Sequence, residues 1–443
     1  MSALPCRRDV LRTAALAGVS VASSAAPNAS PKVLRIGMVG VGGRGTGLLR
    51  QLLRLDGVNV TAVCDPIESR VARAQDVVAS AGQPRPDGYA RGDHDFRRLV
   101  DRNDLDMIVN ATPWQWHAPI SLAALRSGKH VATEVPAALT VDECWELVEA
   151  VERTGHYCTM LENDCYDRET LIILNMLRAG LLGDPLFAEA GYCHDLRSVQ
   201  FDTVPNGEPW RLDHSVRRNG NLYPTHPIGP IAWWMDITRG DRFDFLVSMS
   251  TRSRSLHEFA IKQFGDDDPR AKLKFAQGDS NTTLIRTVQG RYISLYFDTS
   301  TPRPKEEMMR FQCTKGCYSA LEKKIFIDGL SNRNEGPDWL HNPQFEAFEP
   351  YAKQYDHALW KARGSTAAGS EHGGIDYMEM YRLVKNLQTG LPPDMDIYDA
   401  VTWSVISPLS ELSVANRNRS VDIPDFTRGK WKHRPAIDPD AIL

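Results

Sequence analysis

The stretch Leu34-Arg-Ile-Gly-Met-Val-Gly-Val-Gly-Gly-Arg-Gly-Thr-Gly-Leu-Leu-Arg50 decides the fold. It begins as an apolar strand pattern, passes through Gly-x-Gly-x-x-Gly at Gly40, Gly42 and Gly45, and continues as an apolar helical pattern. These glycines let the chain turn tightly and let its backbone approach a pyrophosphate, which then sits on the helix N-terminus. The stretch therefore predicts a dinucleotide-binding site between a strand and a helix.

A carboxylate at a set distance from the glycines indicates which dinucleotide binds. The predicted strand Val58–Cys64 ends at Asp65, about twenty residues past Gly45, where a Rossmann fold places the acceptor for a ribose 2′-hydroxyl. An acid here repels a 2′-phosphate, so we predict NAD rather than NADP. The alternative is a glycine-rich turn in another nucleotide fold, but strand, motif, helix, strand and acid together favour the Rossmann interpretation.

Composition limits the partners of the chain. Its 443 residues suffice for two or three domains with a large core. A net charge of −4 does not indicate binding to nucleic acid. No apolar run reaches the roughly 18 residues of a membrane span. The eight cysteines form no Cys-x-x-Cys pair, and no histidine cluster accompanies Cys313 and Cys317. We therefore expect a small-molecule partner, no nucleic acid, no membrane span and no metal site.

Residues 1–30 do not resemble a folded segment. Arg7-Arg8 precedes a weakly apolar run over 14–22, and small residues continue through Ala26, a pattern that resembles a bacterial twin-arginine signal peptide. Because NAD is made in the cytoplasm, a protein loaded with it should cross the membrane folded. We predict a signal peptide over 1–30 and a periplasmic or exported protein; an ordinary disordered N-terminus is the alternative.

Residues 31–156 alternate predicted strands with predicted helices. This order implies a parallel sheet, and so an NAD-binding Rossmann domain, in which ligands sit at the carboxyl ends of the strands. Two such ends carry polar or aromatic residues, namely Thr112 to His117 and Glu134-Val135-Pro136. The predicted strands are 34–39, 58–64, 105–111 and 129–134, and the predicted helices include 119–127 and 141–154.

Residues 157–443 form a second domain, predicted to be an α+β substrate and oligomerisation domain. Most of its strands alternate apolar and polar residues, which suits a large, mostly antiparallel open sheet. Helices, above all 376–389, and a tail over 422–443 follow. The predicted strands are 157–161, 186–192, 243–251, 281–288, 292–298, 309–314 and 324–328. Between them, the polar, glycine- and proline-containing segments Trp210-Arg211 and 219–229 have the composition of functional loops.

A Rossmann half followed by a motif like Glu-Lys-Pro resembles the Gfo/Idh/MocA oxidoreductases, which use that lysine in catalysis. Here the motif reads Glu134-Val135-Pro136, so the lysine is absent. A series of motifs in order along the chain resembles glycoside hydrolase family 109, the NAD-dependent branch typified by bacterial α-N-acetylgalactosaminidases. The motifs are Gly-Gly-Arg-Gly at 42–45, Trp-Gln-Trp-His at 114–117, Glu-Val-Pro at 134–136, Glu-Asn-x-Cys-Tyr at 162–166, Tyr-x-His-Asp-Leu-Arg at 192–197, Asn-Gly-Asn-Leu-Tyr-Pro-Thr-His at 219–226, Gly-Asp-Ser-Asn-Thr-Thr at 278–283 and His-Gly-Gly-Ile-Asp-Tyr at 372–377.

The resemblance implies hydrolysis of a terminal sugar by oxidation at C3, elimination, water addition and reduction, with NAD used but not consumed. It implies catalytic roles for His226, Tyr223 and Glu134. Substrate contacts are implied for Tyr192, Arg211, Tyr223, His226 and, in place of a family tyrosine, Lys305. Cofactor contacts are implied for Gly40, Gly42, Arg44, Gly45, Asp65, Trp114, Gln115, Trp116, His117, Glu134, Val135, Asn163 and Tyr223.

Structural alternatives accompany these roles. Taken alone, His226 would be a satisfied buried histidine, Tyr192 a sheet residue, and Trp114 and Trp116 packing residues. Arg211 could pair with Asp213 instead of substrate.

Two residues depart from the family pattern. Pro227 stands where the family has glycine, which predicts a shift of His226. Lys305 stands where it has tyrosine, which predicts a different, anionic sugar.

Two other functions remain open. A sugar dehydrogenase of the same fold would release reduced cofactor, and the missing lysine at position 135 counts against it. A non-catalytic sugar-binding protein would keep NAD for structure, and only Pro227 and Lys305 favour it. The natural ligand is a small glycoside or a glycan terminus in the leading interpretation. Since open-faced sheets in this group often pair, we also expect a homo-oligomer.

Overall fold

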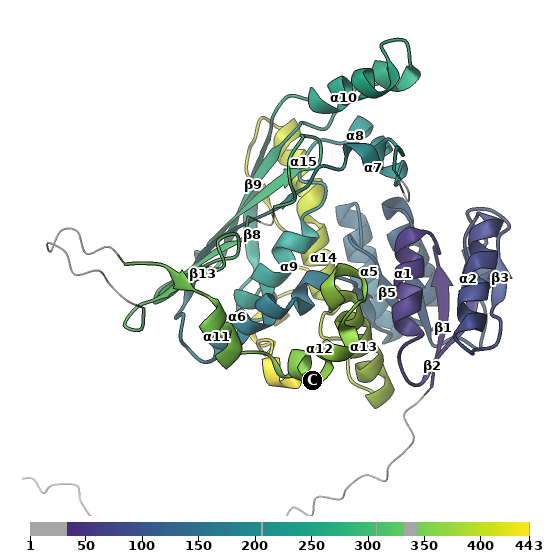
Figure 1. Cartoon of the computed structure of the whole chain (residues 1–443), viewed down its shortest axis with the longest axis horizontal. Helices are drawn as coiled ribbons and strands as arrows, with labels where there is room; N and C mark the ends of the chain where they lie inside the picture. Colours follow the sequence, from purple (N-terminus) through teal and green to yellow (C-terminus); the bar gives the residue numbers. More distant parts are fainter. Residues whose placement is uncertain (1–32, 205–206, 307, 332–342, 443) are drawn as a thin grey trace, which may run out of the picture.

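The protein is described by a computed structural model that covers residues 33–204, 207–306, 308–331 and 343–442. Two sheets and the helices packed on them make up the fold, with the first sheet at the N-terminal end of the chain (Figure 1). The predicted signal peptide over 1–30 lies outside the described residues. Within them, no helix is long and apolar enough to cross a membrane.

The first sheet has six parallel strands in the order β3-β2-β1-β4-β5-β6. This is the doubly wound order of a Rossmann fold, whose switch point lies between β1 and β4. The central strands are buried because helices cover both faces. The strands are β1 (Leu34–Val39), β2 (Val58–Cys64), β3 (Asp87–Tyr89), β4 (Met107–Asn110), β5 (His130–Thr133) and β6 (Cys158–Met160); the helices are α1 (Gly43–Leu52), α2 (Glu68–Ser80), α3 (Phe96–Val100), α4 (His117–Arg126) and α5 (Val141–Thr154).

The sixth strand differs from the sequence-based division of the chain. The sequence analysis places the strand 157–161 in the second domain, whereas β6 pairs in parallel with β5 and completes the first sheet. The reason is the helix between them. Thr140 and Glu143 form a capping box at the start of α5, and Gly155 ends it in a left-handed conformation. A capped helix between two strands is the crossover of a β-α-β unit, so β6 returns to the same sheet.

The glycine loop after β1 requires its glycines. Gly40 has a φ of +81°, and a Cβ there would lie 2.5 Å from the carbonyl oxygen of Ala111 at the end of β4. A Cβ on Gly45 would lie 1.9 Å from the carbonyl oxygen of Gly40. The loop is therefore folded back on the first turn of α1, and its backbone stays open to a ligand.

The second sheet has nine strands in the order β14-β13-β12-β11-β7-β10-β9-β8-β15. Its described pairs are antiparallel except β7 with β10, so the predicted mostly antiparallel sheet is confirmed. The sequence-based strands omit β12, β14 and β15, which are two to four residues long. The strands are β7 (Pro185–Cys193), β8 (Phe243–Ser250), β9 (Asn281–Thr287), β10 (Tyr292–Asp298), β11 (Arg310–Cys313), β12 (Gly316–Ser319), β13 (Lys324–Ile327), β14 (Glu346–Ala347) and β15 (Val421–Asp422).

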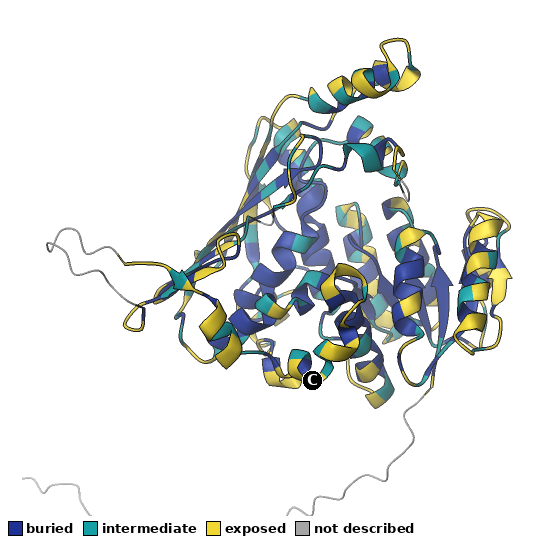
Figure 2. Cartoon of the chain, in the orientation of Figure 1, coloured by how far each residue is buried: buried dark blue, intermediate teal, exposed yellow. Residues whose placement is uncertain are grey.

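Several of the helices within residues 168–415 lie between the two sheets (Figure 1). Their inner surfaces are buried (Figure 2), and Trp233, Trp234 and Trp403 are among the largest fully buried side chains. The predicted helix 376–389 is confirmed as α13. The helices are α6 (Arg168–Arg178), α9 (Thr225–Trp234), α11 (Glu349–Gln354), α12 (Ala358–Ala367), α13 (Ile375–Thr389), α14 (Ile397–Ser404) and α15 (Ile406–Ala415).

A small lobe stands apart from this core at the top of Figure 1. It comprises α7 (Arg197–Gln200), α8 (Trp210–Arg217) and α10 (Ser255–Phe264). Phe201, Leu256, Ala260 and Ala271 form a separate apolar cluster within it. Because Leu212 on α8 packs against that cluster, the lobe supports the helix that carries Arg211.

The segment 219–229, predicted to be a loop, is half helical. Its loop portion ends at Pro224, and α9 begins at Thr225. His226 and Pro227 therefore lie in the first turn of α9, where backbone N–H groups have no partner within the helix. A proline there costs no helical hydrogen bond.

The substitution Gly45→Ala tests the folding of the glycine loop. The new Cβ collides with the Gly40 carbonyl, and overpacking of this kind costs roughly 1–3 kcal/mol. We expect a lower melting temperature and weaker binding of NADH, measured by thermal unfolding and nucleotide fluorescence. Gly364→Ala is the matched control, since Gly364 lies within α12 and its Cβ would meet Trp360 at an ordinary 3.5 Å. Equal behaviour of the two variants would contradict the close approach of Gly45 to Gly40.

Candidate functional site

Four side chains from both domains form an aromatic cluster beyond the carboxyl end of β4. Trp114 lies in a 3-10 turn, η1 (Trp114–Trp116), and its ring stacks on Tyr223 with 5.3 Å between centroids. Tyr192, at the end of β7, meets Tyr223 edge-on at 4.7 Å. The Arg211 guanidinium lies 5.0 Å from the centroids of both Trp114 and Tyr223. Rings and a planar cation in this arrangement can hold a sugar ring and its hydroxyls.

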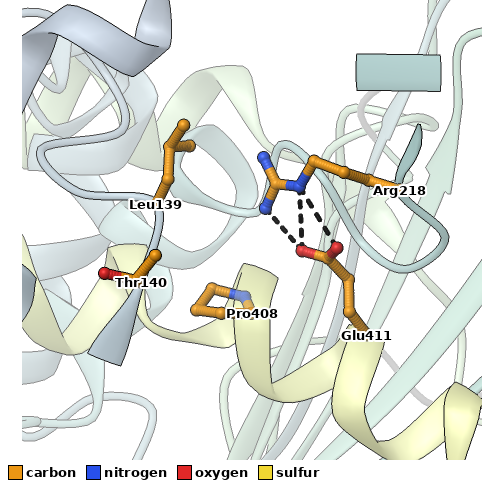
Figure 3. Close-up of a pocket in the computed structure, with 5 residues that line it drawn as sticks. All are labelled: Leu139, Thr140, Arg218, Pro408 and Glu411. Atoms are coloured by element: carbon orange, nitrogen blue, oxygen red, sulfur yellow. Dashed lines mark hydrogen bonds and ion pairs between the residues drawn. The ribbon is translucent and has the colours of Figure 1, made fainter. Parts of the chain in front are cut away.

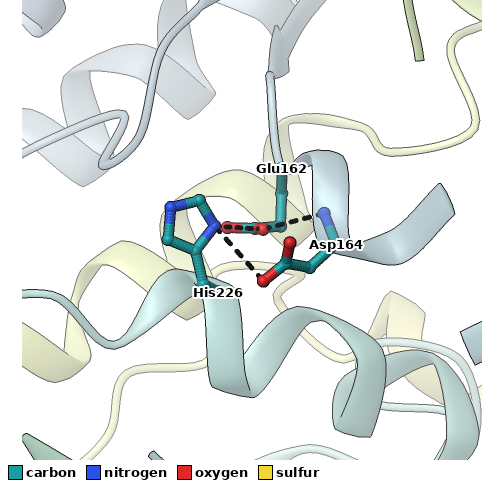
Figure 4. A group of neighbouring side chains, drawn as sticks. All are labelled: Glu162, Asp164 and His226. Atoms are coloured by element: carbon teal, nitrogen blue, oxygen red, sulfur yellow. Dashed lines mark hydrogen bonds and ion pairs between the residues drawn. The ribbon is translucent and has the colours of Figure 1, made fainter. Parts of the chain in front are cut away.

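His226 lies beside this cluster with both ring nitrogens in contact. Nδ1 is 2.7 Å from Glu162 Oε1, and Nε2 is 3.2 Å from the Tyr223 hydroxyl. Figure 4 shows the imidazole facing Glu162 and Asp164, whose Oδ2 lies 3.7 Å from Nδ1. Glu162 precedes the 3-10 turn η2 (Asn163–Tyr166) and is fully buried. The carboxylate therefore fixes the orientation of the ring, leaving Nε2 toward the cluster.

These carboxylates change the acidity of His226. Burial disfavours the imidazolium, but the charges of Glu162 and Asp164 outweigh burial and raise the pKa of His226 to about 9. At neutral pH the ring is therefore a cation that can give up a proton and recover it. Burial also raises the pKa of both Tyr192 and Tyr223, more than the Arg211 charge lowers it, so both phenols remain protonated.

Arg44 connects the glycine loop to two other parts of the chain. Its Nε donates to Glu134 Oε1 at 2.5 Å, and its Nη1 donates to Asp376 Oδ2 at 2.6 Å. Asp376, on α13, also lies 2.8 Å from His372 Nδ1 and accepts from Asn163 Nδ2 at 2.7 Å. Burial alone would raise the pKa of Asp376, but His372 and Arg44 lower it below the usual carboxyl range. Asp376 is therefore ionised.

One buried acid near this network has no hydrogen-bond partner among the described residues. Both carboxyl oxygens of Glu379 are unpaired, and burial raises the pKa of Glu379 well above its usual value. The neighbouring charges include Glu134, Asp376 and Glu162, which raise it further. Glu379 is therefore a neutral acid close to the ionised Asp376.

The residues of the glycine loop fit a bound dinucleotide. The loop leaves no room for a Cβ at Gly40 or Gly45, and α1 presents the N-terminus that binds a pyrophosphate. Asp65 is buried at the end of β2, where its oxygens accept from the backbone N–H groups of Val41 and Ile67 at 3.1 and 3.0 Å. Each oxygen keeps a second lone pair, so a ribose hydroxyl can still donate to the carboxylate.

The remaining cofactor candidates differ in their surroundings. Val135 is buried, Gln115 is exposed, and Trp116 packs on His94 and Phe96, away from the aromatic cluster. His117 is fully buried with both ring nitrogens 2.7 Å from backbone carbonyl oxygens, those of Pro136 and Thr112. Burial lowers the pKa of His117. This ring therefore joins the two strand-end loops and does not face a ligand.

The substrate candidates are not all in the cluster. Arg211 is ion-paired with Glu208, not with Asp213 as the alternative interpretation held. Lys305 is exposed in the loop after β10. Burial and the charge of Lys305 lower the pKa of His194, whose ring centroid lies 6.2 Å from that of Tyr192. Lys305 therefore lies at the margin of the cluster, whereas Tyr192, Arg211 and Tyr223 belong to the cluster and His226 lies beside it.

A cavity of about 390 Å³ lies between the two domains, and none of the candidate catalytic, substrate or cofactor residues lines it. It is lined by Leu139, Thr140, Arg218, Pro408 and Glu411 (Figure 3). Arg218 pairs with Glu411 and donates to Ser407 Oγ at 3.0 Å. This ion pair holds the segment before Asn219 against α15. The residues that line the cavity therefore help to position the site.

Sequence reasoning missed three residues that shape the site, namely Glu162, Asp376 and His214. Glu162 and Asp376 lie inside motifs quoted in the sequence analysis. The motifs do not indicate that Glu162 contacts His226 or that Asp376 contacts Arg44. His214 lies one turn along α8 from Arg211, and its ring is 4.9 Å from Trp114. That helical spacing was the available signal.

Comparison with known proteins identifies the two halves of the chain. Residues 34–161 match the family model described as "Oxidoreductase family, NAD-binding Rossmann fold". Residues 166–433 match the model described as "Glycosyl hydrolase 109, C-terminal domain". A "Glycosyl hydrolase family 109 protein" from Solibacter usitatus is 42% identical over 97% of this chain and 99% of its own. A protein from Shewanella oneidensis named "Alpha-N-acetylgalactosaminidase" is 40% identical over 96% of this chain and 94% of its own.

Solved structures share the fold at lower identity. An NAD-binding oxidoreductase from Klebsiella pneumoniae has a TM-score of 0.67 and 16% identity, covering 88% of this chain and 99% of its own. Levoglucosan dehydrogenase in complex with NADH and levoglucosan has a TM-score of 0.64 and 19% identity, with the same coverage. These neighbours confirm the predicted combination of a Rossmann sheet with a large, mostly antiparallel sheet.

The variant Glu162→Gln tests the His226 contact. Removing the charge leaves burial to oppose the imidazolium, so the pKa of His226 should fall from about 9 toward its ordinary value of about 6.5 or below. In the wild type, the stabilising contribution of His226 is fully present below pH of about 6.5 and is lost as pH rises through about 9. Histidine-selective NMR titration and urea unfolding at several pH values measure both effects.

Glu258→Gln is the control, since Glu258 is an exposed residue of α10 that pairs with Arg254. Titrations with and without a chelator distinguish the imidazolium from a divalent cation, because the ligand atoms of Glu162, Asp164 and His226 lie within 4.8 Å of one another. An unchanged His226 titration in Glu162→Gln would refute the electrostatic account.

Proposed function

The chain belongs to glycosyl hydrolase family 109 and is an NAD-dependent glycoside hydrolase, and we propose that it releases terminal α-linked N-acetylgalactosamine or a related sugar. The observation that carries the proposal is the contact between His226 and Tyr223. Their Nε2 and hydroxyl atoms are 3.2 Å apart within an aromatic cluster beyond the strands that hold the glycine loop. A proton-transfer pair and a dinucleotide site thus meet where one sugar ring can reach both.

The chain's own residues hold the cofactor at one side of this cluster. When bound, NAD supplies a hydride acceptor for an oxidation that is reversed before the turnover ends. Gly40, Gly42 and Gly45 would admit the pyrophosphate, and Asp65 would accept a hydrogen bond from the ribose hydroxyl. Arg44 holds Glu134 at the carboxyl end of β5. Trp114 and Asn163 are the further proposed cofactor contacts. The structure gives less support to Gln115, which is exposed, to Trp116, which packs on His94 and Phe96, and to Val135, which is buried.

Proton transfer falls to Tyr223 and His226. The neutral fraction of His226 would accept the C2 proton, acidified by a ketone at C3, through the Tyr223 hydroxyl as the anomeric group leaves. The imidazolium formed in this way would return the proton when water is added. Arg211, fixed by Glu208, and Tyr192 hold the sugar against Tyr223. Glu134 accepts a sugar hydroxyl from the cofactor side.

A dehydrogenase of the same fold is the competing function. Position 135 carries valine, which is 1% exposed and cannot shuttle a proton. A dehydrogenase that releases its product ketone needs a group there to take the hydroxyl proton away. The proton-transfer pair lies instead at His226, which suits elimination from an oxidised sugar.

The two departures from the family pattern bear on the sugar. Pro227 lies in the first turn of α9, and His226 beside it contacts Glu162. The shift of His226 relative to the family pattern stays a prediction. Lys305 lies at the margin of the cluster, where a cation would favour an anionic group on the far part of the substrate. Lys305 therefore affects which sugar substrate the site prefers.

Location and assembly are further proposals. The twin-arginine pattern at Arg7-Arg8 supports export of a folded, NAD-loaded protein to the periplasm. Exposed apolar residues on strands of the second sheet support a homo-oligomer through that sheet; they are Leu186, Phe245, Met249, Leu284 and Tyr292.

The glycosidase proposal predicts aglycone release without net NADH. Purified mature protein is incubated with aryl α- and β-glycosides, headed by the α-N-acetylgalactosaminide, with and without added NAD. His226→Asn should reduce the rate about 10²–10⁴-fold, the usual contribution of a general acid or base. His257→Asn, on α10, is the matched control. Net NADH from a free sugar without aglycone release would instead establish the dehydrogenase.

The export proposal predicts a periplasmic location that depends on the arginine pair. Replacing Arg7 and Arg8 by lysine should leave the protein in the cytoplasm with its signal segment uncleaved, as detected by cell fractionation and N-terminal sequencing. Replacing Arg73 and Arg85, which lie in the folded domain, by lysine is the control. Cytoplasmic location of the unaltered chain would refute the proposal.

A further inference from the structure

Three side chains of metal-binding types meet on the Nδ1 side of His226, while Nε2 faces Tyr223. The ligand atoms of Glu162, Asp164 and His226 all lie within 4.8 Å of one another. Glu162 precedes the turn η2, Asp164 lies within it, and His226 comes from the first turn of α9 (Figure 4). The sequence analysis expected no metal site, and Glu162 and His226, 64 residues apart, meet only in the folded protein.

The spacing of these atoms suits one small ion. Glu162 Oε1 lies 2.7 Å and Asp164 Oδ2 lies 3.7 Å from His226 Nδ1. Zn²⁺ binds nitrogen and carboxylate oxygen at roughly 2.0–2.2 Å, which places neighbouring tetrahedral ligands about 3.4 Å apart. Asp164 is close to this spacing already, and Glu162 needs to withdraw only slightly to admit an ion between its carboxylate and the ring.

One buried oxygen of this group has no hydrogen-bond partner among the described residues. Glu162 is fully buried, and its second carboxylate oxygen, Oε2, accepts no hydrogen bond from any of them. A buried oxygen of this kind is normally satisfied by bound water or by an ion. Asp164 provides the path from solvent, because its side chain is 40% exposed whereas that of His226 is 18% exposed.

The charges and the types of ligand atom narrow the class of ion. The carboxylates of Glu162 and Asp164 together cancel the charge of a divalent cation, whereas a proton on His226 leaves one of them uncompensated. One imidazole nitrogen with two carboxylate oxygens suits Zn²⁺ and the neighbouring first-row metals, while Mg²⁺ and Ca²⁺ prefer shells made almost entirely of oxygen. Three protein ligands leave the fourth tetrahedral position to a water.

The outer contacts of these ligands also suit a metal site. A histidine bound to a metal normally donates its other ring N–H to a nearby acceptor, and Nε2 of His226 lies 3.2 Å from the Tyr223 hydroxyl. The Glu162 carboxylate is oriented in turn by the backbone N–H of Asp164, which donates to Oε1 at 3.3 Å.

A second group of possible ligands, Glu371, His372 and Asp376, is less suited to an ion. Arg44 Nη1 donates to Asp376 Oδ2 at 2.6 Å and lies 3.5 Å from His372 Nδ1. A cation of the protein therefore already occupies this position, and the group serves as a control.

We propose that Glu162, Asp164 and His226 bind one Zn²⁺ or a similar divalent transition-metal ion, which inhibits the enzyme. The ion takes the place of the proton on Nδ1, and that proton passes to solvent. Nε2 then keeps its own hydrogen and has no lone pair with which to accept the C2 proton through Tyr223. The inhibitory step rests on the proposed function, whereas the metal site itself does not.

Binding is measured on the NAD-loaded protein by calorimetry with Zn²⁺ and by the visible absorption of Co²⁺. We expect one ion per chain, and we expect Asp164→Asn to weaken binding at least about 10–100-fold, the loss that even an outer partner of a metal site causes. Glu371→Gln, in the second group of possible ligands, should bind as the wild type does. Equal affinity of Asp164→Asn and the wild type overturns the proposal, as does the absence of one bound ion per chain.

Inhibition is measured as aglycone release at increasing Zn²⁺. The bound ion should reduce the rate about 10²–10⁴-fold, the usual contribution of a general base, and a chelator should restore it. Mg²⁺ at the same concentration should leave the rate unchanged, and Asp164→Asn should keep its own rate in Zn²⁺. Full activity with Zn²⁺ bound overturns the inhibitory role.

The two measurements separate this proposal from the glycosidase assignment. If no glycoside is cleaved with or without Zn²⁺, the assignment fails and the inhibitory step fails with it, whereas binding of one ion that is lost in Asp164→Asn still supports the metal site. Cleavage that Zn²⁺ does not affect overturns the inhibitory proposal and leaves the assignment intact. If Asp164→Asn does not fold, His226→Asn takes its place in the binding measurements, and unchanged affinity overturns the site.

Discussion

The ion pairs of Arg44 are the constraint on which the arrangement of the site depends. The guanidinium leaves the first turn of α1, reaches Glu134 beyond β5 and meets Asp376 on α13. One side chain thus joins the glycine loop, a neighbouring strand end and the second domain. Breaking a buried pair of this kind leaves an uncompensated charge and costs about 3–5 kcal/mol. Arg44 therefore holds Glu134 close to the cofactor loop and ties both to α13 of the second domain.

Charge is distributed unevenly across this site. On the cofactor side, Arg44 neutralises Glu134 and Asp376, while Glu379 avoids a further charge by staying protonated. On the sugar side, Glu162 holds His226 as a cation, and His214, surrounded by arginines, is neutral. Two histidines a short distance from the same aromatic cluster thus take opposite protonation states at neutral pH. Their neighbours explain the difference: His226 faces carboxylates, and His214 faces guanidinium groups.

Most of the fold followed from local patterns in the sequence. The glycine motif, the strand-helix alternation and the end of β2 at Asp65 predicted the first sheet, because each depends on residues close together in the chain. The position of His226 in a helix was missed because Pro224, Pro227 and Pro230 suppress the helical pattern, although the first turn tolerates proline. Glu162 and Asp376 were missed as site residues because their partners are 64 and 332 residues away in the chain. Such contacts depend on how the domains dock, which no local pattern encodes.

The contrast between Val135 and His226 explains how one fold serves two kinds of chemistry. A dehydrogenase must dispose of a hydroxyl proton and then release the ketone and the reduced cofactor. A hydrolase that restores its cofactor must instead retain the oxidised sugar until elimination, water addition and reduction are complete. Under the proposed function, the buried Val135 offers no proton path at the strand end, and the His226–Tyr223 contact would provide one next to Arg211. The location of the proton-transfer group, more than the presence of NAD, therefore distinguishes the hydrolase from its dehydrogenase relatives.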